Sequence, residues 1–307
     1  MSEFRIKTEI PRLDVALNHK TVVGCVGSCF AQEIGTRMRE GGFEVGVNPH
    51  GILFNPISIL HYFQMLSGVR TARMLKSEKG WLSLDHHGML ASDSEAELSE
   101  KITVLNNVAN GIFARTDVFL ITLGTAHVWQ WNDDSTVVAN CHKIPANHFT
   151  RRLASIEEIV KALQDCMDLF PTARFVFTVS PIRYTRDTLV GSNRSKARLL
   201  EAVHTVVESS SKAFYFPAYE IVVDELRDYR FYKDDMVHPT DLAVEYVYQQ
   251  FLSSVGDTQT LGVASDIRRL SRAMHHRGLT SLTSAAEAQE KAKLEIARKI
   301  EEERSKR

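Results

Sequence analysis

The sequence predicts an α/β protein of three layers, in which a doubly wound parallel sheet of five strands lies between helices. The first observation is that short apolar segments alternate with longer segments of helical periodicity along most of the chain, as in a parallel sheet covered on both faces. The second is that these apolar segments are continuous rather than alternating, which is typical of strands buried on both sides. We therefore expect a flavodoxin-like layout, with a site at the carboxyl ends of the strands.

The expected elements follow one another in a regular order. Ser94 and Ser155 each precede a glutamate by three residues, which is the spacing of a capping box at a helix start. Strands are expected at 21–27, 43–47, 117–124, 174–181 and from Ala213 onward. Helices are expected at 31–40, 57–67, 94–115, 155–170, 193–211 and 241–255.

Two segments outside this alternation are predicted to form β-hairpins. Residues 81–92 form the first, and residues 126–141 alternate in polarity around a turn at 132–135. Since the second hairpin directly follows the third strand, we expect it to be inserted at the end of that strand.

The composition changes at about residue 256. We therefore divide the chain into an α/β domain, 1–255, and a charged, helical C-terminal extension, 256–307. Residues 284–307 are rich in Ala, Glu and Lys, and their apolar stripe is thin. This pattern favours a solvated helix or a partly disordered tail, and the helix is a candidate contact for a protein partner.

Composition excludes several classes of partner. The 307 residues include 37 basic and 38 acidic ones, so a nucleic-acid-binding surface is not expected. No apolar segment approaches the ~20 residues that a membrane span needs. The N-terminus lacks the apolar core of a secretory signal, which predicts a cytoplasmic protein. The four cysteines are scattered, so reduced thiols are expected.

Ser28 is the first candidate for chemistry, because it follows the first predicted strand where the first helix begins. A side chain at this corner emerges at the carboxyl edge of the sheet. The N–H groups of the helix start can stabilise a developing oxyanion there. A nucleophilic serine and a serine that only caps the helix both fit this position.

The second candidate is the pair Asp235 and His238, three residues apart in a turn before the last predicted helix. One loop can then carry a carboxylate that fixes the imidazole tautomer, and the other ring nitrogen can act as a general base. Taken alone, the same pattern also fits two solvated surface residues.

Longer motifs accompany these residues. They are GSCFA at 27–31, NPHGILFNPISI at 48–59, ITLGTAHVW at 121–129, NCHKIP at 140–145, TVSPIR at 178–183, SKARL at 195–199, YFPAYEI at 215–221 and DELRDYRFYKDDMVHP at 224–239. An early strand-end serine with a late Asp-x-x-His resembles the SGNH/GDSL hydrolases. The full set resembles the GSCFA-domain family, which is similar to those hydrolases in fold and in its serine and histidine positions. The resemblance spans residues 5–255.

The resemblance implies roles for particular positions. Ser28 matches the nucleophile, His238 the general base and Asp235 its orienting partner. Gly51 matches a glycine that donates its N–H to the oxyanion, and the N–H of Ser28 is a further donor.

One motif departs from the SGNH pattern. Those enzymes carry Gly-x-Asn after the third strand, whereas this chain has Gly124, Thr125, Ala126 and His127. Thr125 is the candidate for the third oxyanion donor, and Asn140 is the alternative.

Polar residues on the family motifs are candidates for the substrate pocket. Arg183 can hold a substrate anion in a bidentate grip, and a structural ion pair fits it equally. Asn140 and His142 either shape the pocket or fix the hairpin by bonding backbone groups. The full set is Asn55, His127, Asn140, His142 and Arg183.

Cys29 competes with Ser28 for the role of nucleophile. A thiolate is the stronger nucleophile, and a helix start can lower the thiol pKa, but a buried apolar role also fits. A zinc site would need Cys25, Cys29, Cys141 and His142, whose spacing lacks the short loops of zinc knuckles. Neither a metal nor a cofactor is expected.

Three functional hypotheses follow. The first is an SGNH-type serine esterase or O-acyltransferase, and the resemblance implies a small or carbohydrate ester as its substrate. The second is a binding or scaffold protein of the same fold with weak or no catalysis, motivated by the missing Gly-x-Asn and the charged C-terminal helix. The third is a thiol enzyme that depends on Cys29.

Overall fold

The computed structural model describes residues 5–78, 80–88, 90–142, 144–276 and 282–305. Its centre is a sheet of five parallel strands in the order β11-β10-β6-β1-β2. This is the flavodoxin-like order, so the predicted fold class is confirmed. The strands are β1 (Val22–Gly27), β2 (Glu44–Val47), β6 (Val118–Leu123), β10 (Arg174–Val179) and β11 (Ala213–Tyr215).

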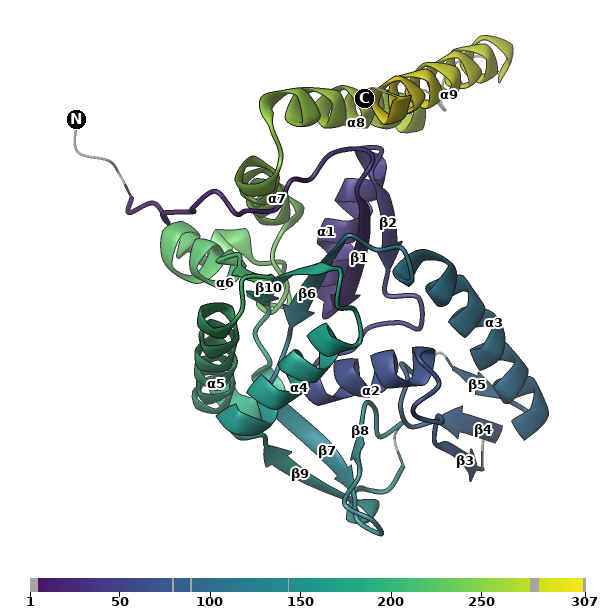
Figure 1. Ribbon diagram of the computed structural model, residues 1–307, viewed down its shortest axis with the longest axis vertical. Coiled ribbons are helices and arrows are strands. Elements are labelled where there is room, and N and C mark those ends of the chain that lie inside the picture. The colour runs from purple at the N-terminus through teal and green to yellow at the C-terminus, as the bar shows by residue number, and fades with distance from the viewer. Residues whose placement is uncertain (1–4, 79, 89, 143, 277–281, 306–307) are drawn as a thin grey trace.

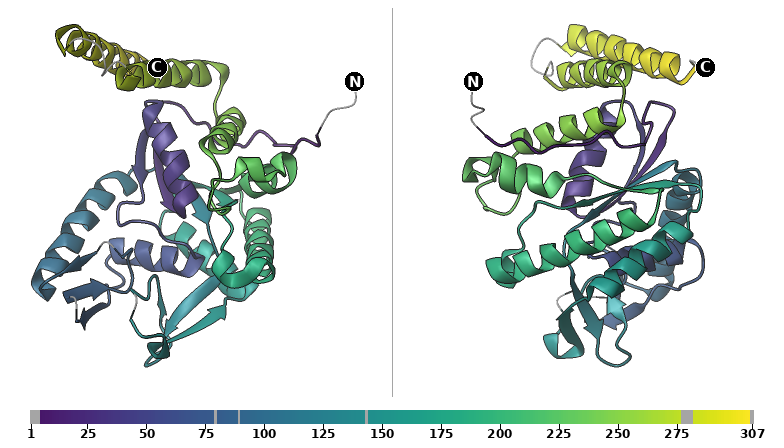
Figure 2. Two further views of the ribbon diagram at one scale, coloured as in Figure 1. Left: turned by 180° about the vertical axis from the view of Figure 1, so that it is seen from behind. Right: turned by 60° about the vertical axis from the view of Figure 1, so that its left-hand side comes forward.

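Helices cover both faces of the sheet and bury a separate apolar cluster on each (Figures 1 and 2). On one face Phe63, Phe119 and Phe175 pack together. The helices there are α2 (Pro56–Leu66), α3 (Glu95–Phe113), α4 (Ile156–Asp168) and α5 (Thr188–Ser209). On the other face are α1 (Cys29–Glu40), α6 (Ala218–Glu220), a π-helical turn (Ile221–Leu226) and α7 (Asp241–Val255). Among the described residues, no helix combines the length and the apolar character needed to cross a membrane.

Two small antiparallel sheets contain the predicted hairpins. Each has one strand more than expected, because β3 and β9 carry polar, partly exposed residues that hide their strand pattern. The first sheet has β3 (Met74–Ser77), β4 (Gly80–Ser83) and β5 (Ala91–Ser92). The second has β7 (His127–Trp131), β8 (Val137–Val138) and β9 (Phe149–Leu153), and it continues directly from the carboxyl end of β6.

Helix starts follow the capping signals in the sequence. The Ser155 hydroxyl accepts the Glu158 N–H and the Glu158 carboxylate accepts the Ser155 N–H, which completes the predicted capping box of α4. The α5 helix begins at Thr188, five residues before the expected start at 193, because a 3₁₀ turn at Thr185–Asp187 leads straight into it. Two further 3₁₀ turns are Ala146–His148 and Tyr229–Phe231.

The C-terminal extension forms α8 (Thr258–His276) and α9 (Leu282–Ser305), which lie together at one end of the molecule (Figure 1). Lys299 of α9 pairs with Asp266 of α8 at 2.8 Å, and the Arg304 guanidinium donates to the His19 carbonyl at 3.3 Å. The α9 helix is therefore not solvated on all sides. The expected partial disorder falls in part on residues 277–281 and 306–307, which lie outside the described residues.

Arg268 docks α8 onto the α/β domain. Its guanidinium donates twice to the Glu245 carboxylate of α7, each time at 2.6 Å, and lies 4.7 Å from the centre of the Tyr248 ring. The Arg268 side chain is only 6% exposed, so the protein shields this ion pair from most of the solvent.

Replacing Arg268 by Met should lower the free energy of unfolding by roughly 2 kcal/mol, because Glu245 loses both charge-assisted hydrogen bonds. Arg269→Met is the matched control, since Arg269 is 78% exposed and pairs with Asp266 on its own helix. Its effect should stay within about 0.5 kcal/mol. Urea denaturation followed by circular dichroism measures both changes, and equal effects would contradict this role of Arg268.

Candidate active site

Ser28 lies at the corner between β1 and α1 and is fully buried. As the N-cap of α1, its hydroxyl accepts the N–H of Phe30 at 3.2 Å. Its own N–H donates to the Thr122 carbonyl of β6 at 3.0 Å. In this conformation the serine side chain caps the helix.

Gly27 makes this corner possible. Its φ is +137°, and a Cβ at this position would lie 2.1 Å from the Thr122 carbonyl oxygen, so only glycine fits. The Gly27 N–H donates to the Asn48 side chain at 2.9 Å, and its carbonyl accepts the N–H of Leu53 at 3.0 Å. The corner is thus held between β6 and the loop that follows β2.

Asp235 and His238 form a hydrogen-bonded pair in the loop before α7. The His238 Nδ1–H donates to Asp235 Oδ2 at 2.7 Å, and the N–H groups of Val237 and His238 donate to Oδ1, each at 2.9 Å. The backbone bond from His238, followed by the ring bond, lowers the pKa of Asp235 to about 2. The carboxylate therefore stays ionised and fixes the imidazole, whose Nε2 is left as an acceptor.

The structure brings the loops of Ser28 and His238 to the same apolar cluster but does not join the two side chains. Cys29, Tyr184 and Val237 pack against that cluster. Among the hydrogen bonds of the described residues, none links the Ser28 hydroxyl to the His238 ring. The His238 side chain is 41% exposed, whereas Ser28 is enclosed.

The three predicted oxyanion donors all have partners inside the protein. The Ser28 N–H donates to Thr122 as described, and the Gly51 N–H donates to the Asn48 carbonyl at 2.8 Å. The Thr125 N–H donates to the Phe54 carbonyl at 2.9 Å. In this conformation these backbone donors are engaged, so a bound oxyanion would have to displace their present acceptors.

Tyr184, which sequence reasoning missed, lies over the end of β6. A Cβ on Gly124 would come within 2.6 Å of its hydroxyl. The hydroxyl is buried and has no hydrogen-bond partner among the described residues. Burial, and secondly the nearby Cys29, raise the pKa of Tyr184. The only signal was its position directly after the TVSPIR motif.

Lys196 is the second residue that sequence reasoning missed. Its ammonium donates to the Gly124 carbonyl at 2.7 Å and to the Ser180 carbonyl at 2.6 Å, so it ties the loops after β6 and β10 together. It is 3% exposed, and burial lowers its pKa to about 7. The SKARL motif that contains it was the available signal, together with Ser195, whose hydroxyl accepts the Ala126 N–H at 2.7 Å.

The candidate pocket residues do not gather at one place. Asn55 caps α2, and its side-chain oxygen accepts the Ser58 N–H at 2.9 Å. The His127 ring lies 3.1 Å from the Asp187 carboxylate, which also pairs with Arg151. Arg183 lines a pocket beside α5.

Asn140 and His142 bond to the backbone, as the second interpretation of that motif expected. The Asn140 side-chain oxygen accepts the His142 N–H at 3.0 Å, and His142 Nε2 lies 2.6 Å from the Ser83 carbonyl of β4. They hold the connection after β8 against the first small sheet.

The cysteines are all free thiols. Burial raises the pKa of Cys29, which fits the buried apolar role and not the alternative of a reactive thiolate. Burial also raises the pKa of Cys25 to about 12. Within the part of the chain that the structure describes, no three His, Cys, Asp or Glu side chains form a group able to hold a metal ion.

Three histidines, His50, His86 and His87, lie in or beside the loop that contains Gly51. His50 Nδ1 lies 3.1 Å from the Tyr62 hydroxyl, and the His50 ring stacks on His86 with 5.0 Å between centroids. A Cβ on Gly51, whose φ is +88°, would lie 2.5 Å from His87 Cβ. Burial lowers the pKa of His50 to about 4 and that of His86 to about 3, so both rings are neutral at pH 7.

Fold and site together define a class: a doubly wound α/β protein with flavodoxin-like strand order, a strand-end serine and a His–Asp pair. The chain belongs to the GSCFA family, whose family model matches residues 22–251. No curated protein matches the chain.

Two solved structures show a distant likeness. One is a Clostridium thermocellum family 3 carbohydrate esterase, with 11% identity, a TM-score of 0.33, and coverage of 76% of this chain and 94% of that one. The other is a family two carbohydrate esterase from Clostridium thermocellum in complex with cellohexaose, with 13% identity, a TM-score of 0.33, and coverage of 84% and 67%.

Lys196→Met should lower the free energy of unfolding by roughly 2 kcal/mol, because the Gly124 and Ser180 carbonyls lose a buried donor. Lys161→Met is the control, since Lys161 is 75% exposed and pairs with Asp165 on its own helix. Urea titrations of the two variants give the comparison. A Lys196 variant as stable as the Lys161 variant would show that the tie between the two loops contributes little.

Acid should destabilise the protein through His50 and His86. Their folded pKa values lie below the ordinary 6.5, so the unfolded chain binds more protons as the pH falls from 6.5 towards 4. The free energy of unfolding should then fall by about 1.4 kcal/mol per pH unit for each histidine.

The His86→Asn variant should show a shallower slope in urea titrations between pH 7 and pH 5. The exposed His204 is the control position, and His204→Asn should leave the slope unchanged. If His86→Asn also leaves the slope unchanged, the assigned role of the buried ring is wrong.

Proposed function

We propose that this protein is a serine hydrolase of the SGNH type that acts on a small or carbohydrate ester through Ser28, His238 and Asp235. The observation that carries the proposal is the Asp235–His238 pair. The Asp235 carboxylate accepts a hydrogen bond from His238 Nδ1–H at 2.7 Å and from two backbone N–H groups at 2.9 Å. This arrangement prepares an imidazole with a free Nε2 in a partly exposed loop, as a general base requires.

In the proposed reaction His238 Nε2 takes the proton of the Ser28 hydroxyl as Oγ attacks the ester carbonyl. The tetrahedral intermediate collapses, the C–O bond to the alcohol breaks, and His238 returns the proton to the leaving alcohol. Water, or an acceptor hydroxyl in an acyl transfer, then attacks the acyl-serine with His238 again as base. The acid or new ester leaves and Ser28 is restored.

The proposal requires a rearrangement at the corner. The Ser28 hydroxyl must leave the Phe30 N–H, and at least one engaged backbone donor must turn to the substrate. Tyr184 is the side chain that we expect to move. Its hydroxyl lies over Gly124 and has no hydrogen-bond partner among the described residues, so no hydrogen bond holds it there. Cys29 is not the nucleophile in this proposal, because burial raises the pKa of its thiol.

A specific observation favours a second candidate, a binding protein with little or no catalysis. The N–H groups of Ser28, Gly51 and Thr125 all donate to backbone carbonyls, and losing one oxyanion donor typically costs about 10²–10³ in rate. On this hypothesis the serine is only a helix cap, and ligand binding is independent of its hydroxyl.

Ser28→Ala should lower turnover of a short-chain ester such as p-nitrophenyl acetate by about 10³-fold or more, because the nucleophile is lost. Labelling of the wild-type protein by a fluorophosphonate should disappear in the same variant. Turnover is measured spectroscopically, and labelling by intact mass.

Ser67→Ala is the control, since Ser67 is an exposed C-cap residue of α2 and should leave turnover and labelling unchanged. Circular dichroism must show that Ser28→Ala folds, since loss of the cap alone costs about 1 kcal/mol. Absence of labelling and of turnover in the wild-type protein would favour the binding protein.

A further inference from the structure

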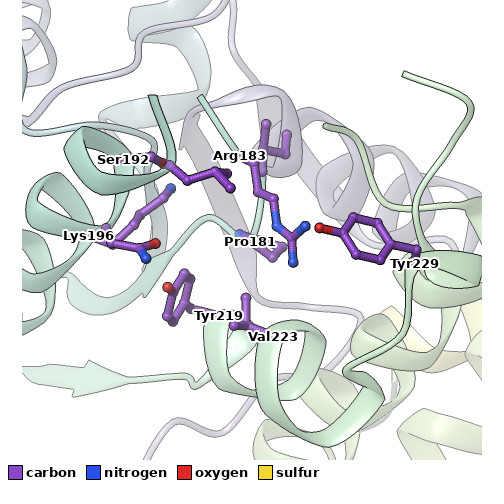
Figure 3. A pocket seen from close by; sticks show the side chains of 10 residues that line it. Pro181, Arg183, Ser192, Lys196, Tyr219, Val223 and Tyr229 are labelled. Carbon is purple, nitrogen blue, oxygen red and sulfur yellow. The ribbon is translucent and has the colours of Figure 1, made fainter. Parts of the chain in front are cut away.

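A pocket of about 230 Å³ lies beside α5, between the loop after β10 and the helical turns after β11. Figure 3 shows that Arg183 reaches into it, with the Tyr229 hydroxyl beside the guanidinium and Tyr219 on another wall. Lys196 lines it from α5. Among its described lining residues, none is acidic.

Arg183 is held in this pocket by aromatic rings. Its guanidinium lies 5.1 Å from the centre of the Tyr229 ring and 4.3 Å from that of Tyr232. Among the described residues, no carboxylate lies within ion-pairing distance of it, so the structural pair that the sequence also allowed is not formed there. Cation–π contact with these rings positions the guanidinium, and its N–H donors that do not face the tyrosine hydroxyls can bind an oxyanion.

Lys196 is a second basic residue of the pocket lining, contributed by α5. Its two hydrogen bonds go to backbone carbonyls, and the described residues place no carboxylate in ion-pairing distance of it. The Arg183 guanidinium, which has no carboxylate partner there, is costly in a partly buried pocket. A bound anion would offset that cost, and it would favour the protonated form of Lys196.

We propose that this pocket binds an oxyanion group of the substrate, a carboxylate or a phosphate, against the Arg183 guanidinium. This proposal rests on the proposed function and adds that the substrate carries a negative charge. The backbone N–H of Arg183 donates to the backbone carbonyl of Val237 at 3.3 Å. The loop that lines the pocket with Arg183 therefore contacts the loop that carries His238.

Isothermal titration calorimetry on the full chain tests the pocket with three probes: sodium phosphate, disodium succinate and neutral glucose. Either or both anions should bind and glucose should not. Arg183→Gln should weaken anion binding about tenfold or more, since it removes charge-assisted hydrogen bonds. Arg230→Gln is the control, because it removes the same charge from a residue outside the pocket lining. Arg230 is 68% exposed and pairs with Asp228. The effect of Arg230→Gln should stay below twofold.

Asn193→Asp is a second variant for the case that Arg183→Gln does not fold. Asn193 is exposed and lines the pocket, so the new carboxylate should repel the anion without disturbing the core. Binding of phosphate alone, or succinate alone, identifies the group. Absence of binding by both anions, or equal losses in Arg183→Gln and Arg230→Gln, would overturn the inference.

Ser28→Ala separates this inference from the proposed function, because that variant should keep anion binding. Anion binding without Ser28-dependent turnover would leave the pocket standing and remove the hydrolase. Ser28-dependent turnover with no anion binding would support the hydrolase and overturn the anion pocket. If both hold, an ester with a free carboxylate, such as a hemisuccinate, should show a lower KM than the matching acetate, and Arg183→Gln should abolish the difference.

Discussion

The close approach of β1 to β6 at Gly27 is the constraint on which the carboxyl edge of the sheet depends. With the Thr122 carbonyl 2.1 Å from where a Cβ would stand, any other residue would force the two strands apart. Because the chain can turn there, Ser28 caps α1 instead of extending β1. The loop after β2 can then close onto the same corner through Asn48.

This constraint also explains why the corner is closed. Parallel strands leave unpaired N–H and C=O groups at their carboxyl ends, and buried groups of this kind must find partners. Here the loops supply these partners: Gly51 bonds to Asn48 within the loop after β2, and Thr125 after β6 bonds to Phe54 in that same loop. Lys196 supplies the donor that the Gly124 and Ser180 carbonyls share. The same hydrogen bonds that stabilise the edge therefore occupy the donors that catalysis would use, so an active form must exchange internal acceptors for the substrate.

Sequence patterns predicted what depends on local chemistry. Continuous apolar segments predicted the five central strands, Ser155 and Glu158 predicted a capping box, and the Asp235–His238 spacing predicted a hydrogen bond that the structure contains. The patterns could not predict what depends on contacts between distant segments. Strand β9 carries Arg151 and Arg152 on a partly exposed edge, so its polarity concealed it. In the sequence Lys196 looks like any other lysine of a helix. Only the fold shows that the loops after two strands meet at its ammonium.

Arg183 and His238 are linked through the loop that precedes α7. Tyr229 and Tyr232 flank the guanidinium and precede Asp235 in the same loop, while the Arg183 backbone bonds to Val237. An anion bound between these groups would hold the loop after β10 and the histidine loop together. Tyr184 follows Arg183 directly, so movement of that loop also moves the phenol that covers Gly124. If the pocket binds an anion and Tyr184 moves when substrate binds, both events would act on one segment, residues 180–184.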